Sequence, residues 1–330
     1  MYILGNSEIE SLLVGGQLSW NDIIATCEQV FRWIGEGEVV QEHSSPMYYS
    51  LRDGHHAFAL PFPACIKPLN IVGNKWGGSS NGNRASGLRS FMASIILNDA
   101  ETAEPKALFD ASLITSMRTG GHAAVGAKYL ARRDSHNIAV IGCGAEGGSF
   151  LCALNEIFDI HQVTAVARRF ESAKAYAARF GAMLDLNIEP MTSVEHAVRN
   201  ADIICMCTSS PDPILLDQWI RPGTHVAATR AFLDYDPHFS RTADKWVLGN
   251  HQSDEQWLSK PPFVGIPHLS TDNVYADMVQ IIRGDKPGRE HDHERTTMTH
   301  MGMGALDVAM AHQVYRRALD SGLGKFIDMQ

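Results

Sequence analysis

The spacing of apolar residues changes along the chain, and the changes predict three regions. Residues 7–35 carry apolar side chains at helical spacing behind two capping motifs, Ser7-x-x-Glu10 and Ser19-x-x-Asp22, so two packing helices come first. Residues 38–110 form short runs broken by glycine, proline and asparagine, which is typical of a mainly antiparallel sheet. From residue 137, strand-like runs alternate with helical segments, and this predicts a parallel, doubly wound sheet.

The expected elements can be placed along the chain. In the first sheet, where Pro61 and Pro63 are expected to separate two strands, we predict strands at residues 47–52, 56–60, 70–76, 86–97 and 106–109. A helix is predicted for residues 111–131, and later strands for residues 163–166, 183–184, 202–207, 224–229 and 244–248. Further helices are predicted for residues 171–180, 192–198, 273–283 and 305–319. Because the last helix follows the doubly wound region, we expect it to return to the first domain.

A glycine motif follows the apolar run at residues 138–141. Its spacing is G-x-G-x-x-G, and a helical segment comes next. In a dinucleotide site such glycines make the strand-to-helix turn, admit the pyrophosphate and let the helix pack on the strand. The phosphates then lie on free N–H groups at the start of the helix. A glycine-rich turn without a ligand is the alternative, but we predict an NAD(P)(H) site whose contacts are Gly142, Gly144, Ala145, Glu146, Gly147, Thr119 and Thr208.

The end of the second strand in such a domain selects between the two nucleotides. An acidic residue there binds the ribose 2′-hydroxyl of NAD, whereas arginine accommodates the 2′-phosphate of NADP. This chain has Ala167-Arg168-Arg169 and no acid at that point. We predict that Arg168 and Arg169 contact the cofactor and favour NADP. Both could equally begin the next helix in solvent, so the choice of nucleotide stays open.

Two cationic residues stand in unusual surroundings. Arg118 precedes Thr119-Gly120-Gly121 inside a predicted helix, where each glycine costs roughly 1 kcal/mol relative to alanine. Such glycines indicate close approach of another backbone or a ligand, and an arginine beside them could hold a carboxylate or phosphate through two hydrogen bonds. Lys75 lies between Gly73-Asn74 and Trp76-Gly77-Gly78. From the residues alone, either side chain could also be a solvated surface cation.

Composition narrows the classes of function. The chain has 330 residues, 45% of them hydrophobic and 20% charged, which fits a globular protein long enough for two domains. The formal net charge of −9 argues against a nucleic-acid surface and an anionic membrane partner. No apolar stretch approaches the roughly 20 residues of a transmembrane helix. We expect no signal peptide and no membrane association.

Cysteine and histidine patterns add two expectations. Six scattered cysteines without C-x-x-C spacing indicate buried, reduced thiols and a cytoplasmic location. The polar run that holds His291, His293 and, further on, His300 could bind a metal. Because His-x-His in a charged loop is more often solvated, we predict no metal site.

Several segments spread along the chain carry a family resemblance. They are Lys75-Trp76, RASG at 84–87, IILNDAET at 95–102, ASLITSMRTGG at 111–121, VIGCG at 140–144, GDKPGRE at 284–290 and MGMGALD at 301–307. Together they resemble the ornithine cyclodeaminase/μ-crystallin family along nearly the whole chain. Within the family they are most similar to the 2,3-diaminopropionate synthases of siderophore and peptide-antibiotic pathways.

The resemblance implies an architecture and a set of site residues. An α/β fold is expected, in which a Rossmann domain at residues 116–302 is inserted in an α+β substrate-binding and dimerisation domain at residues 1–115 plus 303–330. Lys75 and Arg118 match the catalytic, carboxylate-binding residues of the family, and Arg52 matches a further substrate-binding arginine less securely. A homodimer and a small amino-acid-type substrate are implied, and the chemistry is expected in the cleft between the domains.

One departure from the family bears on the reaction. Cyclodeaminases carry a catalytic aspartate in a D-x-P-G-K segment, where this chain has Phe232 and no Pro-Gly-Lys. The resemblance therefore favours oxidative cleavage of N-(1-amino-1-carboxy-2-ethyl)glutamate to 2-oxoglutarate and 2,3-diaminopropionate. An NADPH-dependent ketimine or imino-acid reductase, an amino-acid cyclodeaminase and a μ-crystallin-like binding protein remain alternatives. The general base stays open among Asp234, His225 and His122.

Overall fold

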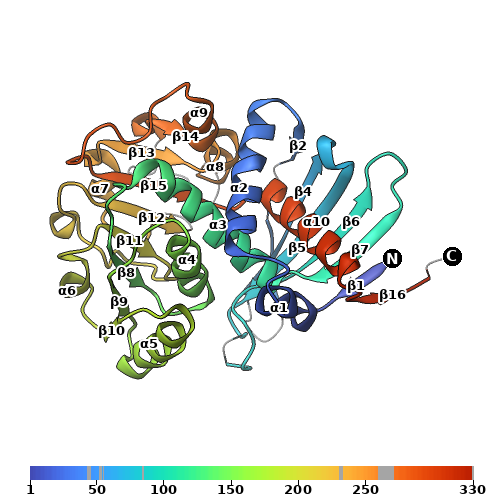
Figure 1. The fold of residues 1–330 in the computed structure, drawn as a ribbon, viewed down its shortest axis with the longest axis horizontal. Helices are drawn as coiled ribbons and strands as arrows, with labels where there is room; N and C mark the ends of the chain where they lie inside the picture. The colour runs from blue at the N-terminus through green and yellow to red at the C-terminus, as the bar shows by residue number, and fades with distance from the viewer. Residues whose placement is uncertain are drawn as a thin grey trace. The chain divides into compact units, whose positions relative to one another are not determined.

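The chain forms two compact units in a computed structural model that describes residues 1–42, 46–51, 54, 56–83, 85–229, 233–258 and 271–328. One unit comprises Met1–Arg118 and Met303–Gln330, and we call it the split unit. The other comprises Thr119–Gly302, and we call it the inserted unit because it interrupts the chain of the first. Figure 1 gives the order of the elements. The predicted fold class, α/β with a Rossmann sheet, is confirmed.

The split unit is built on a mixed, mainly antiparallel sheet. Its strand order is β16-β1-β7-β6-β5-β4-β2, with β3 also paired to β4, and only β1 and β7 run parallel. The strands are β1 Tyr2–Leu4, β2 Val39–Gln41, β3 Met47–Ser50, β4 His56–Ile66, β5 Ile71–Ser80, β6 Met92–Asp99, β7 Pro105–Asp110 and β16 Lys325–Phe326. The predicted antiparallel-rich sheet is thereby confirmed.

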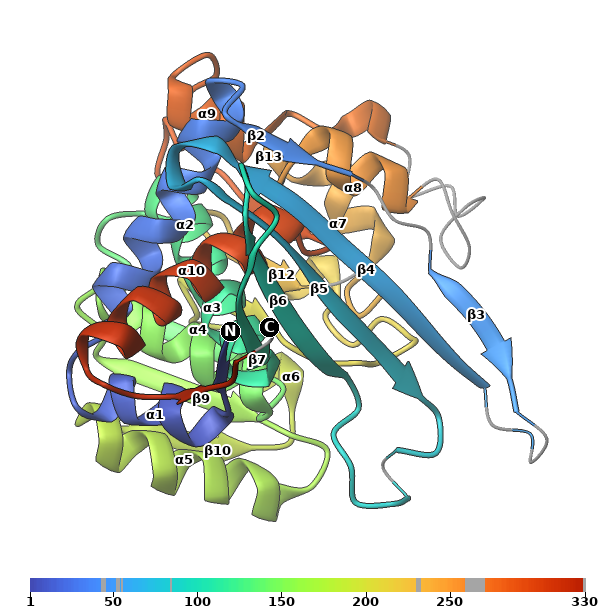
Figure 2. The same ribbon diagram turned by 90° about the vertical axis from the view of Figure 1, so that its right-hand side faces the viewer.

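Helices cover one face of this sheet. They are α1 Asn6–Val14, α2 Trp20–Gly35 and α10 Gly304–Asp320, and a short 3₁₀ turn, η1 Lys67–Leu69, links β4 to β5. Figure 2 shows α10 lying across the strands, and it contacts β4, β5 and β6 as well as α1 and α2. The last helix therefore does return to the first domain, as its position in the sequence indicated. Its contact with β5 brings Asp307 to Lys75, although the two residues are far apart in the sequence.

Two strand predictions in this unit are wrong. Pro61 and Pro63 do not separate strands but lie inside β4, which pairs continuously with β5. Neither β2 nor β3 pairs with residues 60–63, so the missing proline N–H groups leave no gap in a ladder on that side. The predicted strand at 86–97 begins only at Met92, because the preceding residues form turns around Gly87, whose φ is +71°.

The inserted unit is a doubly wound sheet in which all the strands run parallel. The spatial order is β10-β9-β8-β11-β12-β15-β13-β14. Its strands are β8 Asn137–Ile141, β9 Gln162–Val166, β10 Ile188–Met191, β11 Ile203–Met206, β12 His225–Thr229, β13 Lys245–Leu248, β14 Ala276–Asp277 and β15 Thr296–His300. If β8 is numbered as strand 1, the strands β10-β9-β8-β11-β12-β15 lie in the order 3-2-1-4-5-6, which is the order of dinucleotide-binding sheets. The sixth place is taken by β15.

Helices pack on both faces of the inserted sheet. They are α3 Ser112–Leu130, which begins in the split unit, α4 Ala145–Asn155, α5 Phe170–Leu184, α6 Val194–Val198, α7 Pro237–Thr242, α8 His251–Leu258 and α9 Met278–Arg283, with short 3₁₀ turns η2 Asp217–Trp219 and η4 Thr271–Asn273. On one face, α4 packs closely against α3, because a Cβ on Gly120 would collide with the backbone of Ser149. This close approach explains the glycine inside the helix. The other face is buried by the core around Ala139, Val226 and Trp246.

Two predictions in the inserted unit need correction. Met183 and Leu184 are not a strand but the last turn of α5, because Gly181 does not end the helix. The helix ends instead at Asp185, whose left-handed φ of 55° lets its N–H bond to the Gly181 carbonyl. Residues 273–283 are not one helix, since Asp277 ends β14 and caps α9 through the N–H of Gln280.

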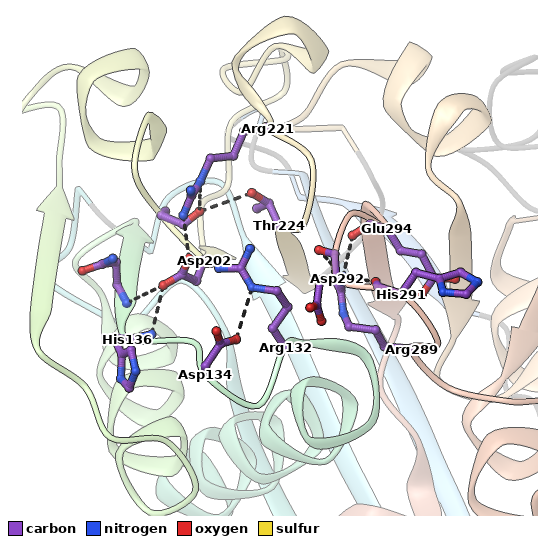
Figure 3. A network of polar contacts seen from close by, with 12 residues as sticks. Arg132, Asp134, His136, Asp202, Arg221, Thr224, Arg289, His291, Asp292 and Glu294 are labelled. Atoms are coloured by element: carbon purple, nitrogen blue, oxygen red, sulfur yellow. Dashed lines mark hydrogen bonds and ion pairs between the residues drawn. The ribbon is translucent and has the colours of Figure 1, made fainter.

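A polar network around the buried Asp202 fixes the amino ends of two parallel strands (Figure 3). Asp202 accepts hydrogen bonds at 2.5 Å from both Arg132 and Arg221, and at 2.9 and 3.0 Å from the backbone N–H groups of His136 and Asn137. This carboxylate therefore ties the start of β8 to the start of β11. The amino edge of the sheet is occupied by structural contacts, and ligands of such sheets bind at the opposite, carboxyl edge.

The segment GDKPGRE at residues 284–290 also has a structural role in this region. Arg289 donates at 2.7 Å from Nε to the carbonyl of Leu130, at the end of α3, and at 2.7 Å from Nη1 to the carbonyl of Glu294. A Cβ on Gly288 would collide with the carbonyl oxygen of Tyr129. The glycine and the arginine thus join the loop before β15 to the end of α3.

Candidate active site

The glycine motif forms the turn between β8 and α4. Gly142 has a φ of +110°, and a Cβ there would collide with the carbonyl of Cys207. A Cβ on Gly147 would collide with the carbonyl of Gly142, so this glycine sets the packing of α4 on the loop. At Gly144 no atom lies within 4 Å of a Cβ position. Since packing does not require that glycine, the open space fits a pyrophosphate approaching the backbone at the start of α4.

Other predicted cofactor residues lie along the same edge. Thr208 follows β11, and its methyl group lies against Gly142. Its hydroxyl donates at 2.8 Å to Asp234, which is buried. Arg168 and Arg169 are exposed directly after β9, at the strand end that reads the ribose. These positions fit an NAD(P) molecule that the glycine loop, Thr208 and the arginines would hold.

Among the other predicted residues, Ala145 and Glu146 lie beside the glycine loop in the first turn of α4, whereas Thr119 is buried in α3. Arg52 and Phe232, like Arg84 of the family-like segments, fall outside the described residues. His225 is the first residue of β12, at the amino edge, where its Nδ1 lies 2.9 Å from the hydroxyl of Thr296. Burial lowers the pKa of His225 to about 3, and its place at the wrong edge removes it as the general base.

A buried ionic cluster lies in the split unit. Lys75 comes from β5, Arg118 from α3 and Asp307 from α10. The lysine Nζ is 2.6 Å from Asp307 Oδ2, and the arginine Nε donates at 2.9 Å to Asp307 Oδ1. Lys75 and Asp307 are 1% and 0% exposed, and Arg118 is 6% exposed. Lys75 and Arg118 were predicted as site residues, and the structure brings them to one carboxylate.

The charges of this cluster do not balance. Among the described residues, the ion pairs of Lys75 and Arg118 both go to Asp307, which leaves one excess positive charge when the lysine is protonated. Burial is the main cause that lowers the pKa of Lys75 to about 8, with Asp307 opposing the shift and Arg118 adding to it. The Nζ also lies 4.3 Å from the centre of the Phe62 ring. A buried cation in excess is stabilised by an anion, and a substrate carboxylate would supply one.

Asp307 is the site residue that the sequence analysis missed. It lies in the last helix between Leu306 and Ala309, which belong to the predicted packing face. An aspartate on an apolar helix face is rarely buried without a partner, and that was the available signal. The cations that pair with it are remote in sequence, and no local pattern identified them.

Cysteine and histidine chemistry does not point to another centre. The six cysteines are free thiols, four of them buried, whereas Cys65 and Cys143 are partly exposed. Burial raises the pKa of Cys143 to about 11, so it is no ready nucleophile. His291 and His293 precede β15 and His300 ends it, so these three histidines lie at opposite edges of the sheet.

One group in the described ranges, His136, Asp159 and His161, has metal-ligand atoms close together. The two rings are stacked at 4.1 Å with an interplanar angle of 3°. Because the ring-nitrogen lone pairs lie in two parallel planes, they do not converge on one ion. We assign no metal to this group.

Comparison with known proteins identifies the family. The model of the ornithine cyclodeaminase/mu-crystallin family matches residues 9–322. The chain belongs to this family. The alanine dehydrogenase of Archaeoglobus fulgidus is 30% identical over 329 residues, which cover 98% of this chain and 97% of that protein. The N-((2S)-2-amino-2-carboxyethyl)-L-glutamate dehydrogenase of Staphylococcus aureus is 30% identical over 269 residues, 78% of each chain.

A solved structure agrees with the fold. The Δ(1)-pyrroline-2-carboxylate reductase of Thermococcus litoralis, in complex with NADH and L-proline, superposes with a TM-score of 0.90 at 26% identity, over 99% of this chain and 100% of that one. This member of the ornithine cyclodeaminase/mu-crystallin family is therefore an NAD(P)-dependent oxidoreductase that acts on amino or imino acids. Within the described ranges, none of its helices combines the length and hydrophobicity needed to cross a bilayer.

Proposed function

We propose that this chain oxidatively cleaves N-(1-amino-1-carboxy-2-ethyl)glutamate with NAD(P)⁺. The products are 2-oxoglutarate and 2,3-diaminopropionate, which serves siderophore or antibiotic biosynthesis. The six free cysteines support a reducing compartment, the cytoplasm.

The observation that carries this proposal is the unbalanced charge around Lys75. Two buried cations share Asp307, so a substrate carboxylate would complete the cluster. Arg118 offers further N–H donors beyond its Nε, and it can bind a carboxylate through two of them. The S. aureus dehydrogenase supports the particular substrate, since its name gives the same aminocarboxyethyl-glutamate skeleton. The absence of the D-x-P-G-K segment in the sequence argues against ornithine cyclisation.

The residues of the chain have defined tasks in this reaction. NAD(P)⁺, when bound, supplies a hydride acceptor for the carbon beside the secondary nitrogen. Lys75 and Arg118 bind the carboxylate on that carbon and orient its C–H bond. Water adds to the oxidised carbon and gives up a proton, and the carbon–nitrogen bond breaks as a proton reaches the nitrogen. The amine, water and NAD(P)⁺ thus become a 2-oxo acid, a primary amine, NAD(P)H and one proton.

An assay of the purified protein tests the proposal. With the aminocarboxyethyl-glutamate and NAD⁺ or NADP⁺, we expect absorbance of reduced nicotinamide and one 2-oxoglutarate for each nucleotide reduced. The exposed Arg168 and Arg169 predict the lower KM for NADP⁺. If neither nucleotide is reduced, the proposal is wrong. Proline and ammonia from ornithine, with no net change in the nucleotide, would identify a cyclodeaminase instead.

A second candidate is the reduction of a cyclic imino acid with NADPH. The T. litoralis reductase carries L-proline and NADH in its structure, and this chain matches its fold along nearly the whole length. The same two cations would bind the single carboxylate of such a substrate. Consumption of NADPH with Δ1-pyrroline-2-carboxylate, and none of NADP⁺ with the glutamate derivative, would favour this candidate.

We also propose that the chain acts as a homodimer through the open face of the split unit's sheet. Lys75 and Ile95 point to the helices, whereas their neighbours Trp76 and Ile96 are 49% and 36% exposed on the other face. Met92 is 49% exposed on β6. Such a set of apolar side chains is typical of a protein interface.

Light scattering of the purified protein should therefore give twice the mass of one chain. The Trp76→Glu variant should have a lower measured mass, closer to that of a single chain. Phe170→Glu, at a similarly exposed residue of the inserted unit, serves as the control and should stay dimeric. A wild-type protein of single-chain mass at micromolar concentration would contradict the dimer.

A further inference from the structure

Two buried histidines meet at the carboxyl edge of the inserted sheet. His300 is the last residue of β15 and stands opposite Thr229, the last residue of β12. The ring of His122, from α3, lies 4.0 Å from that of His300, with an interplanar angle of 36°. Their exposed fractions are 0% and 2%. The sequence analysis weighed His122 as a base but did not connect it with His300.

Close packing of α3 and of the end of β13 fixes this pair. A Cβ on Gly126 would collide with Met298, so α3 lies tightly on β15. Gly249 follows β13, and a Cβ there would come within 2.7 Å of His122 and 2.9 Å of His300. Only glycine lets that backbone pass beside both rings. The two imidazoles are therefore held in one arrangement.

A carboxylate orders the backbone around the pair. Asp254, from α8, is fully buried and accepts hydrogen bonds from the N–H groups of Asn250 at 3.2 Å and Met301 at 3.0 Å. It thus ties the residue after His300 to the turn after Gly249. Burial, the largest cause, raises the pKa of Asp254 to about 7, and the nearby charge of Asp277 acts in the same direction. Asp277 itself accepts a hydrogen bond at 2.9 Å from the N–H of His251, so both carboxyl groups hold the backbone that follows Gly249.

The position of the pair in the sheet gives it access to the reaction. In a sheet of order 3-2-1-4-5-6, the glycine-loop half takes one mononucleotide and the half formed by strands four to six takes the other. β15 is the sixth strand in space, so His300 belongs to the half that would receive the nicotinamide side. His122 also lies four residues after Arg118 in α3, and residues four apart share one face of a helix.

We propose that His122 and His300 together accept the proton that water loses when it adds to the oxidised carbon. This inference rests on the proposed function and names the base that the reaction requires. The oxygen of water bonds to carbon, one of its protons passes to an imidazole nitrogen, and the same proton then reaches the leaving nitrogen as the carbon–nitrogen bond breaks. Two protonated rings at this separation would repel, so the pair holds one proton at a time. Asp254 is a positioning residue in this scheme.

Steady-state kinetics of His122→Gln and His300→Gln tests the proposal. Each variant should lower kcat about 10²- to 10⁴-fold, the usual contribution of a general base, with little change in KM. Nucleotide affinity, measured by fluorescence, should stay within about twofold. The fall of kcat at acidic pH should disappear in both variants. His161→Gln is the matched control, since it removes the exposed ring of a stacked histidine pair, His136–His161, at the amino edge, and it should keep full activity.

A second measurement works without turnover. In nucleotide-free protein labelled with ¹³C-histidine, the ring signals of His122 and His300 should titrate together, and either substitution should change the titration of the other ring. Two variants with wild-type kcat, or rings that titrate independently, would overturn the proposal. If the wild type turns over neither the amine nor the imino acid, the proposed function has failed, and the NMR titration alone then decides whether the pair shares a proton.

Discussion

Asp307→Asn is expected to lower the stability of the split unit by about 3–5 kcal/mol, the usual cost of breaking a buried ion pair from one side. The carboxylate is fully buried and binds Lys75 at 2.6 Å and Arg118 at 2.9 Å. An amide has nearly the same shape, so the loss comes from charge and not from packing. Two buried cations would then face each other without a counter-ion.

Hydrogen exchange of the amides in β5 and α10 measures this loss in the unit concerned. Asp320→Asn, at the exposed end of the same helix, is the control and should exchange like the wild type. Adding Lys75→Met to Asp307→Asn should recover part of the loss, because it removes one of the two stranded cations. Equal exchange in Asp307→Asn and wild type would show that the carboxylate does not neutralise the cluster.

Lys75→Met should lose activity but, unlike Asp307→Asn, keep its stability. Removing one member of a buried, charge-assisted contact costs about 2–5 kcal/mol of binding. At about 1.4 kcal/mol per factor of ten, kcat/KM should fall roughly 30- to 4,000-fold. Nucleotide affinity should not change, because Lys75 is not among the residues expected to hold the nucleotide.

The stability expectation follows from the direction of the pKa shift. The fold lowers the pKa of Lys75 from 10.5 to about 8, so the charged lysine disfavours the folded state below pH 8. This penalty shrinks as pH rises from about 8 to 10.5 and is absent above that range. Methionine removes it, so the thermal midpoint of Lys75→Met at pH 7 should equal or exceed that of the wild type.

The pH dependence of the wild type gives an independent check. Its kcat/KM should decline above pH 8, as Lys75 loses the proton that attracts the carboxylate, and the variant should lack this decline. Lys106→Met, which removes a surface lysine paired with Glu104, controls for the loss of a charge. A Lys75→Met protein with unchanged kcat/KM would refute the carboxylate role.

The inserted sheet was predictable because its signals are local. Local constraints explain the glycines of the motif, since Gly142 needs a positive φ and Gly147 packs closely against the loop. Hydrophobic runs of parallel strands are continuous and easy to recognise. Errors arose where a neighbouring element decided the outcome. Pro61 and Pro63 could enter β4 only because no strand pairs with them on one side. The helix α5 continues past Gly181 and ends at Asp185, which adopts the left-handed conformation although it is not glycine.

The candidate site was predictable only in part, for the same reason. Lys75 and Arg118 stood out through neighbouring glycines and through the family resemblance. Their partner Asp307 follows Arg118 by 189 residues, and the His122–His300 contact joins α3 to β15. Burial against distant residues gives these side chains their chemistry, and spacing along the chain does not identify the distant partner.

Because α10 belongs to the split unit but follows the inserted unit in the sequence, the split unit is completed last during synthesis. The helix that carries Asp307 begins at Gly304 and lies across strands whose residues emerge from the ribosome much earlier. Domains generally fold as units while the chain is made. The inserted unit is complete at Gly302 and has all its strands before α10 is available. During translation Lys75 and Arg118 therefore have no counter-ion, and the sheet around them has an uncovered apolar face. A chain released before residue 304 would carry a complete inserted unit attached to an unfinished split unit.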